Sequence, residues 1–391
     1  MHLSYSFVKK AALFFLSSAA AVSFSLSMED GALKDIYASG KVMLKETLRL
    51  DDGSMPEDVF FEMTMDAVPD GLGHVFVADY KADRIYKFGP SGKFMNAFGK
   101  EGQGPGDLSG PAYIAAAAGR LLVYEIRNRR FSCFDLEGNF LFHHTEKGLG
   151  YRIQKIRGLP NGDFVLEWDI TDFSEPGTPQ DCKIEICSPD LKEKKTLVEG
   201  RIHLQKIIQE PVRTNIPMPF PKRYHWEVSP DGHIIIGFSD KYQIDIYDLA
   251  GKKVRSISRP HTHLPVTKQD EKEFYGMLSF ASSDGTRLSE PPEYVKKHFV
   301  FPSEKPVFHD ILADCQGNIL VCLHQKTREQ ELRTFDAFDQ GGNFIASVRI
   351  EGESPPPVSS RLRLDKDGFW WCHTDAEGLP VVSKLTLAEG N

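Results

Sequence analysis

Several stretches of this 391-residue sequence alternate polar and apolar residues shortly before a turn glycine. A period of two is typical of a β-strand and places the polar side chains on one face. The polar side chains that could do chemistry in these stretches are Arg157, His225, Glu227, His309, Asp310, Arg361 and Arg363. If the strands converge, these residues form either a belt of ion pairs or a cationic channel for a carboxylate, a phosphate or an acidic sugar.

Three carboxylates on these strands, Asp66, Glu227 and Asp310, are the candidate ligands of a hard cation such as Ca²⁺. We expect no cofactor, with calcium as the alternative. The histidines of the segments 143–144 and 261–263 have no further ligand at a recognised spacing, and no Gly-x-Ser-x-Gly elbow occurs. No catalytic residue can therefore be assigned from the sequence.

A second set of polar and aromatic residues follows the second strand of each repeat. It contains Asp79, Tyr80, Arg127, Arg129, Trp168 and His373. Loops at equivalent positions would meet on one rim, where aromatic and arginine side chains suit glycan stacking or peptide capture. The alternative is an ordinary solvated rim.

A structural unit that repeats along the chain would position both of these sets of residues. A turn glycine followed by three or four apolar residues recurs at Gly73, Gly119, Gly162, Gly232, Gly317 and Gly368. An alternating strand, a second turn and, in five of the six units, a further strand follow each glycine. Four antiparallel strands of this kind make one blade, so the sequence predicts an all-β, six-bladed β-propeller.

The sixth unit lacks its fourth strand, and residues 40–50 read like a fourth strand with nothing before it. We expect this N-terminal strand to complete the last blade and close the ring, because an open ring would leave an unpaired edge. The expected organisation is a signal peptide at 1–27 and one propeller at 28–391, with blades at about 57–100, 110–146, 151–200, 222–259, 306–351 and 359–391 plus 40–50.

An insertion at 261–305 between the fourth and fifth blades is predicted to be partly helical. Thr267 is a suitable N-cap with Asp270 three residues later, and Phe274, Met277, Leu278 and Ala281 would share one face. A second short helix is expected to start near Pro292. The insertion either covers one rim as a lid or buttresses it.

Composition and charge narrow the class of partner. A net charge of −8 gives no electrostatic reason to expect nucleic acid. Lys9 and Lys10 precede an apolar stretch of signal-peptide length, so we expect an exported protein, periplasmic or extracellular, with no membrane span after processing. We expect a monomer that binds a protein or glycan partner.

Six cysteines in an exported chain raise the question of disulfides. They are dispersed, and Cys182 and Cys187 lie too far apart along one predicted strand to bond. Cys322 and Cys372 fall on the second strands of adjacent blades and could either touch or point apart. The alternative for all six is that they pack as small apolar residues.

The repeats, the crossover at 102–108, the pattern from Val77 through Arg84 to Gly92, and the segment 306–321 together resemble bacterial six-bladed β-propeller proteins of the NHL-repeat type. The resemblance covers nearly the whole mature chain. It implies an exported propeller on an architecture that also serves lactonases, amidating lyases and pure binding modules. Two hypotheses follow: a non-enzymatic binding or scaffold module, and a metal-dependent hydrolase or lyase that uses the channel carboxylates.

Overall fold

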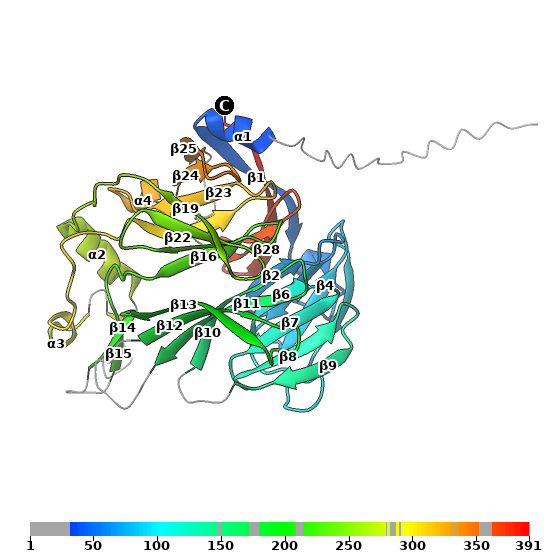
Figure 1. The fold of residues 1–391 in the computed structure, drawn as a ribbon. Coiled ribbons are helices and arrows are strands. Elements are labelled where there is room, and N and C mark those ends of the chain that lie inside the picture. The colour runs from blue at the N-terminus through cyan, green and yellow to red at the C-terminus, as the bar shows by residue number, and fades with distance from the viewer. Residues whose placement is uncertain are drawn as a thin grey trace, which may run out of the picture.

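The computed structural model describes residues 32–146, 151–171, 180–208, 214–278, 280–281, 287–288, 291–331, 333–351 and 362–390. The chain folds into an all-β propeller built from four-stranded antiparallel units with few helices (Figure 1). The predicted signal peptide at 1–27 lies outside these residues. Within them, no helix is long and apolar enough to cross a membrane.

Four units are separate sheets, which we number blades 1 to 4. Blade 1 has β2 (Thr64–Pro69), β3 (Val75–Asp79), β4 (Arg84–Phe88) and β5 (Phe94–Phe98); blade 2 has β6 (Pro111–Ala117), β7 (Arg120–Glu125), β8 (Arg130–Asp135) and β9 (Phe140–His144). Blade 3 has β10 (Tyr151–Gly158), β11 (Phe164–Thr171), β12 (Gln180–Cys187) and β13 (Lys194–Ile202); blade 4 has β16 (Tyr224–Val228), β17 (Ile234–Phe238), β18 (Gln243–Tyr247) and β19 (Lys253–Ser258). The first strand of each blade faces the centre of the ring.

The remaining strands form one eight-stranded sheet, here called the joined sheet, rather than the two further separate blades that the sequence predicts. Its order is β22 (Phe308–Ala313), β23 (Ile319–Leu323), β24 (Thr334–Phe338), β25 (Phe344–Glu351), β1 (Lys41–Leu50), β28 (Pro380–Glu389), β27 (Gly368–Thr374) and β26 (Arg363–Asp365). The two halves merge because β1 pairs in parallel with β25 through Lys41–Met43 while it pairs antiparallel with β28 along most of its length.

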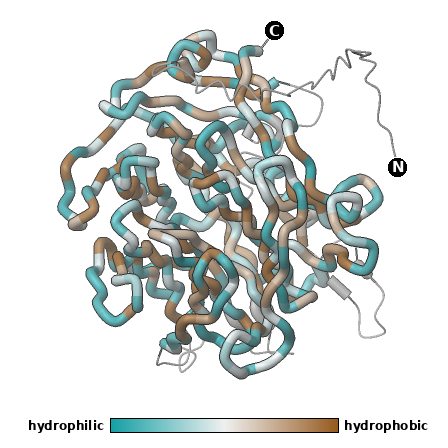
Figure 2. Tube along the Cα trace, turned by 90° about the vertical axis from the view of Figure 1, so that its right-hand side faces the viewer, coloured by the Kyte–Doolittle hydropathy of each residue, from teal (hydrophilic) through white to brown (hydrophobic). Residues whose placement is uncertain are grey.

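Six of the hydrophobic clusters among the described residues lie between neighbouring four-stranded units. One cluster joins blade 1 to blade 2 through Phe76, Ile114 and Leu121. Another joins the β26–β28 half of the joined sheet to blade 1 through Trp370 and Val77. Figure 2 shows hydrophilic segments at many of the outer turns and hydrophobic segments running through the interior. Burial between units, rather than within one sheet, therefore holds the ring together.

Gly158 lets two innermost strands approach closely. A Cβ at this position of β10 would lie 2.1 Å from the carbonyl oxygen of Ala116 in β6. No side chain can occupy that space without moving the backbone, so glycine is required where blades 2 and 3 meet near the axis.

The insertion contains the predicted helix α2 (Lys268–Met277), whose N-cap Thr267 forms a capping box with Asp270. The helix ends at Met277, so Ala281 does not extend its apolar face but lies in β20 (Phe280–Ala281), paired with β21 (Arg287–Leu288). The short helix α3 (Glu293–Lys296) follows Pro292. Phe274 packs with Ile216 of a hairpin, β14 (Gln205–Ile208) and β15 (Thr214–Pro217), in a small core of its own. In Figure 1, α2, α3, β14 and β15 lie on one side of the molecule.

Two short helices were not predicted. Helix α1 (Ala32–Ala38) packs against the joined sheet, where the Tyr37 hydroxyl donates to Asp314 Oδ2 at 3.0 Å. Helix α4 (Arg328–Glu331) follows β23. All six cysteines are free thiols, so Cys322 and Cys372 are not bonded to each other.

Candidate functional site

A cavity of about 290 Å³, the polar cavity, lies at the centre of the ring. Every innermost strand contributes to its wall. The lining side chains are Asp66 from β2, Tyr113 from β6, Gln154, Lys155 and Arg157 from β10, Tyr224, His225 and Trp226 from β16, His309, Asp310 and Leu312 from β22, and Arg363 from β26, together with Glu167, Arg223 and Leu362. The polar residues of the alternating stretches therefore converge near the axis, except Arg361, which lies outside the described residues.

β-Bulges on the innermost strands change which residues reach the cavity. The pairing register skips Met65 in β2, Ala112 in β6, Gln154 in β10 and His309 in β22. A bulge adds one residue and interrupts the alternation of side chains. Two consecutive residues, such as His309 and Asp310, can then line the same cavity, which strict alternation does not allow.

Two bidentate ion pairs lie across the channel. Arg157 donates from Nε and Nη2 to Glu227 at 2.5 and 2.7 Å. Arg363 donates from Nε to Asp66 Oδ1 at 2.5 Å and from Nη2 to Oδ2. Lys155 Nζ lies 3.2 Å from Glu227 Oε2. These residues form a belt of ion pairs, which is one of the two arrangements expected from the sequence; the other was a cationic channel.

The belt separates the polar cavity from a second cavity of about 490 Å³. Arg157 and Arg363 line both cavities. The remaining wall of the second one, the apolar cavity, is mostly apolar and includes Val68, Ile114, Leu159, Pro160, Val228 and Leu364. Paired charges thus divide the channel into two spaces of different character.

Asp310 and His225 differ from the belt residues because no arginine pairs with them among the described contacts. Asp310 Oδ1 accepts from the Ile311 backbone N–H at 2.8 Å and lies 4.0 Å from His225 Nδ1. Burial raises the pKa of Asp310 to about 6, against the opposing charge of Lys155. Burial also lowers the pKa of His225 well below its usual value. Asp310 can therefore exchange a proton near neutral pH, whereas His225 is held in its neutral form.

Glu167 is a buried acid on the blade 3 wall of the cavity and was not predicted as a site residue. Glu167 accepts from Arg223 Nη2 at 2.9 Å and from the Trp226 indole N–H at 2.8 Å. Asp169 lies two residues along the same strand and is 2% exposed. Burial, with the charge of Glu167, raises the pKa of Asp169 to about 7. Glu167 and Asp169 are two acids spaced two residues apart in a largely apolar strand, and this pattern is the sequence signal that could have identified them.

The three carboxylates proposed for calcium are each engaged by, or lie beside, another side chain. Asp66 and Glu227 each bind an arginine bidentately, and Asp310 lies beside His225. Within the described ranges, the His, Cys, Asp and Glu groups close enough to share a cation are Glu167, Asp169 and Cys182 instead.

Two of the six predicted rim residues are not on a rim. Trp168 lies inside β11, not in a loop after it, and is 1% exposed. Asp79 ends β3 and is fully buried, where its carboxylate accepts from the backbone N–H groups of Glu62 at 2.7 Å and Met63 at 3.0 Å. Asp79 therefore holds the segment before β2 against the end of β3.

The other four predicted rim residues are at least partly accessible. The Arg127 guanidinium stacks over the Tyr80 ring at 4.5 Å, and Arg129 is exposed. His373 lies within β27, not in the following loop, and stacks on Trp371 with the ring centroids 3.8 Å apart. None of these residues lines the polar or the apolar cavity. The structure therefore separates the rim residues from the channel residues.

No protein-family model matches the chain. A curated relative, the peptidyl-glycine alpha-amidating monooxygenase of Mus musculus, is 39% identical over 224 residues, which cover 54% of this chain and 21% of that protein. The chain thus spans about a fifth of the length of this relative.

Three of the solved structures with a similar course of the chain come from bacteria. A member of the DUF4221 family from Bacteroides vulgatus is 9% identical, with 90% of this chain and 99% of that chain covered and a TM-score of 0.48. A Bacteroides fragilis protein provisionally described as exported is 9% identical, covers 89% and 96% of the two chains, and has a TM-score of 0.49. Virginiamycin B lyase from Staphylococcus aureus is 14% identical, covers 89% and 100%, and has a TM-score of 0.40. Similarity at this level carries no information about a ligand or a reaction.

Proposed function

We propose that this protein is an exported β-propeller that binds a small acidic sugar, or a carboxylate of similar size, in the polar cavity. The observation that carries the proposal is the Arg223 guanidinium. Its Nε is buried on the cavity wall and, among the described residues, has no hydrogen-bond partner. A buried N–H donor without an acceptor costs about 1–3 kcal/mol, and a ligand carboxylate would satisfy it with a charge-assisted hydrogen bond.

The size and the wall of the cavity support a ligand of this class. About 290 Å³ lies at the lower end of the range for small-molecule pockets, so a folded partner cannot enter. Tyr113 and Tyr224 are only partly buried and offer ring faces and hydroxyl groups, while Gln154 offers an amide. Aromatic rings combined with donors and acceptors suit a polyhydroxylated ring.

Calorimetric titration with galacturonate and galactose tests this proposal, because the two sugars differ in one carboxylate. We expect galacturonate to bind at least tenfold more tightly, and Arg223→Gln to remove most of that difference. Arg127→Gln is the matched control, since Arg127 also pairs with a buried acid, Asp83, but lies outside the cavity. Equal binding of the two sugars, or unchanged galacturonate binding by Arg223→Gln, would contradict the proposal.

Acid–base catalysis in the same cavity is a second candidate function, favoured by Asp310 and His225. A carboxyl with a pKa of about 6 beside a neutral imidazole can pass a proton to or from a bound substrate. The similarity to the amidating monooxygenase makes lyase and ester or lactone substrates the first to screen. Asp310→Asn should reduce any turnover by about 10²–10⁴-fold. Turnover that survives this substitution would exclude Asp310 from the chemistry.

We also infer a ring of six blades of the NHL-repeat type, with the two halves of the joined sheet as the fifth and sixth. Six core clusters, each between consecutive units, support this count. The mature chain would begin near residue 28 after export, act as a monomer, and leave the rim for a protein or glycan partner. N-terminal sequencing of the secreted protein and light scattering test these statements.

A further inference from the structure

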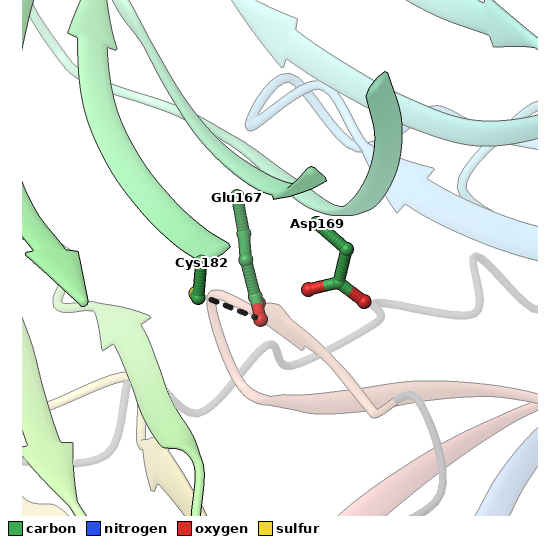
Figure 3. Close-up of side chains that lie close together, drawn as sticks. All are labelled: Glu167, Asp169 and Cys182. Carbon is green, nitrogen blue, oxygen red and sulfur yellow. Dashed lines mark hydrogen bonds between the residues drawn. The ribbon is translucent and has the colours of Figure 1, made fainter. Parts of the chain in front are cut away.

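Three potential metal ligands meet inside blade 3. Glu167 and Asp169 are two residues apart on β11 and so point to the same face of the sheet. Cys182 on β12 pairs directly with Asp169 in the antiparallel register. One ligand atom from each residue lies within 4.8 Å of the other two, and all three residues are buried (Figure 3). We call these residues the acid–thiol cluster.

One acid in this cluster is only partly satisfied, because Gln154 hydrogen-bonds to Asp169 but one of its two carboxylate oxygens is left over. Asp169 is 2% exposed, and its Oδ1 has no hydrogen-bond partner among the described residues. Glu167 is better satisfied, because Oε2 accepts from Trp226, while Oε1 accepts from Arg223 and from the Cys182 thiol, whose sulfur lies 3.9 Å away. A buried carboxylate oxygen that faces a second acid and a thiol is stabilised either by a proton or by a bound cation.

We propose that Glu167, Asp169 and Cys182 bind a divalent transition-metal cation of the zinc class. Two carboxylates and one thiolate are suitable donors for zinc, whereas Ca²⁺ and Mg²⁺ take oxygen ligands. This proposal is independent of the sugar ligand and differs from the calcium alternative in residues and in metal.

Charge balance favours a divalent ion. Cys182 binds a metal only as a thiolate, so its proton leaves to solvent when the ion enters, as does any proton on Asp169. The dication then meets two carboxylates and one thiolate, with the Arg223 guanidinium beside Glu167, and the group as a whole is neutral. A neutral group is compatible with burial, and in the absence of the metal the thiol keeps its proton, because burial raises the pKa of Cys182.

The acid–thiol cluster is close to the polar cavity. Glu167 lines that cavity, so an ion can reach the cluster from the channel, and solvent can supply a fourth ligand. The Trp226 indole holds Glu167 Oε2 and leaves Oε1 on the side of Cys182.

Titration of the purified protein, freed of metal by a chelator, tests the proposal. Zn²⁺ binding is measured by calorimetry, and Co²⁺ binding by the thiolate-to-cobalt charge-transfer absorption. We expect one equivalent of either ion, a sulfur-dependent cobalt band, and a loss of at least tenfold in affinity for both Asp169→Asn and Cys182→Ser. The cobalt band should disappear in Cys182→Ser.

Cys187→Ser is the matched control, because Cys187 is also a buried free thiol on β12 but lies outside the cluster. It should bind Zn²⁺ and Co²⁺ like the unsubstituted protein. Circular dichroism and thermal melting of each metal-free variant show whether it is folded, and Asp169→Asn remains informative if Cys182→Ser is not. Absence of stoichiometric binding, or a cobalt band that survives in Cys182→Ser, would overturn the proposal.

Discussion

The carboxylates around the channel fall into two kinds, although both are buried. Burial alone would raise the pKa of Glu227, but the charges of Arg157 and Lys155 outweigh it, so the pKa is lowered. Burial dominates at Asp310 and Asp169, whose pKa values rise to about 6 and about 7. Glu227 has a bidentate arginine, and the other two acids do not. The difference separates a group that supports the fold from groups able to bind a ligand or a metal.

Removing the charge of Glu227 should have the largest effect. Glu227→Gln leaves Arg157 and Lys155 without their carboxylate inside the ring, and loss of one partner of a buried pair costs about 3–5 kcal/mol of unfolding free energy. Asp310→Asn should cost less than about 1 kcal/mol, because that carboxyl has no such pair. Chemical denaturation of both variants at pH 7 measures the difference. Similar losses would show that the two kinds of carboxylate are equivalent.

The pair formed by Asp66 and Arg363 gives a second way to test the belt. Arg363→Met alone should cost about 3–5 kcal/mol, because it leaves Asp66 buried and unpaired. The double variant Asp66→Leu, Arg363→Met should recover most of that loss, since apolar replacements of a buried pair are often neutral. A double variant no more stable than the single one would indicate that the belt does more than satisfy its own charges.

The pH dependence of the unfolding free energy should have opposite signs for Asp169 and for Glu227. The folded-state pKa of Asp169 is raised, so its contribution to stability is fully present below about pH 4 and is lost as the pH rises toward 7. The metal-free variant Asp169→Asn should remove that loss and gain about 1–3 kcal/mol at pH 7. The contribution of Glu227 is lost instead as the pH falls. Denaturation curves from pH 2 to 8 distinguish these slopes. A pH profile of Asp169→Asn that runs parallel to that of the unsubstituted protein would contradict the prediction.

The rim should respond least. Arg127 is partly exposed, stacks on Tyr80 and pairs with Asp83 at 2.9 Å. Asp83 is buried, but water screens the exposed Arg127 and the Gly110 backbone N–H still donates to Asp83, so Arg127→Ala should cost only about 1 kcal/mol. Thermal melts of Arg127→Ala and Glu227→Gln compare the loss of stability at the outer rim with the loss at the central channel. A loss as large as that of Glu227→Gln would contradict this expectation.

The propeller fold could be predicted because the turn glycines and the alternating strands repeat through the chain. The convergence of Arg157, Glu227 and Arg363 followed from their parity on the innermost strands. His309 and Asp310 share one cavity only because a bulge shifts the register, and period counting does not show a bulge. The acid–thiol cluster depends on the pairing of Asp169 with Cys182 across two strands. A loop of uncertain length separates these strands in the sequence, so their register could not be derived.

The N-terminal strand also determines the order in which the molecule can fold. Leu44 pairs with Leu387 and Leu50 with Val382, so the two ends of the propeller must meet before β1 has its antiparallel partner. Contacts this distant in sequence form slowly, because a long loop must close first. In a growing chain only Lys41–Met43 of β1 can pair, with β25, until β28 has been made, so most of β1 remains an open edge. The antiparallel pairing of β1 with β28 can therefore form only late, after both strands have been synthesised.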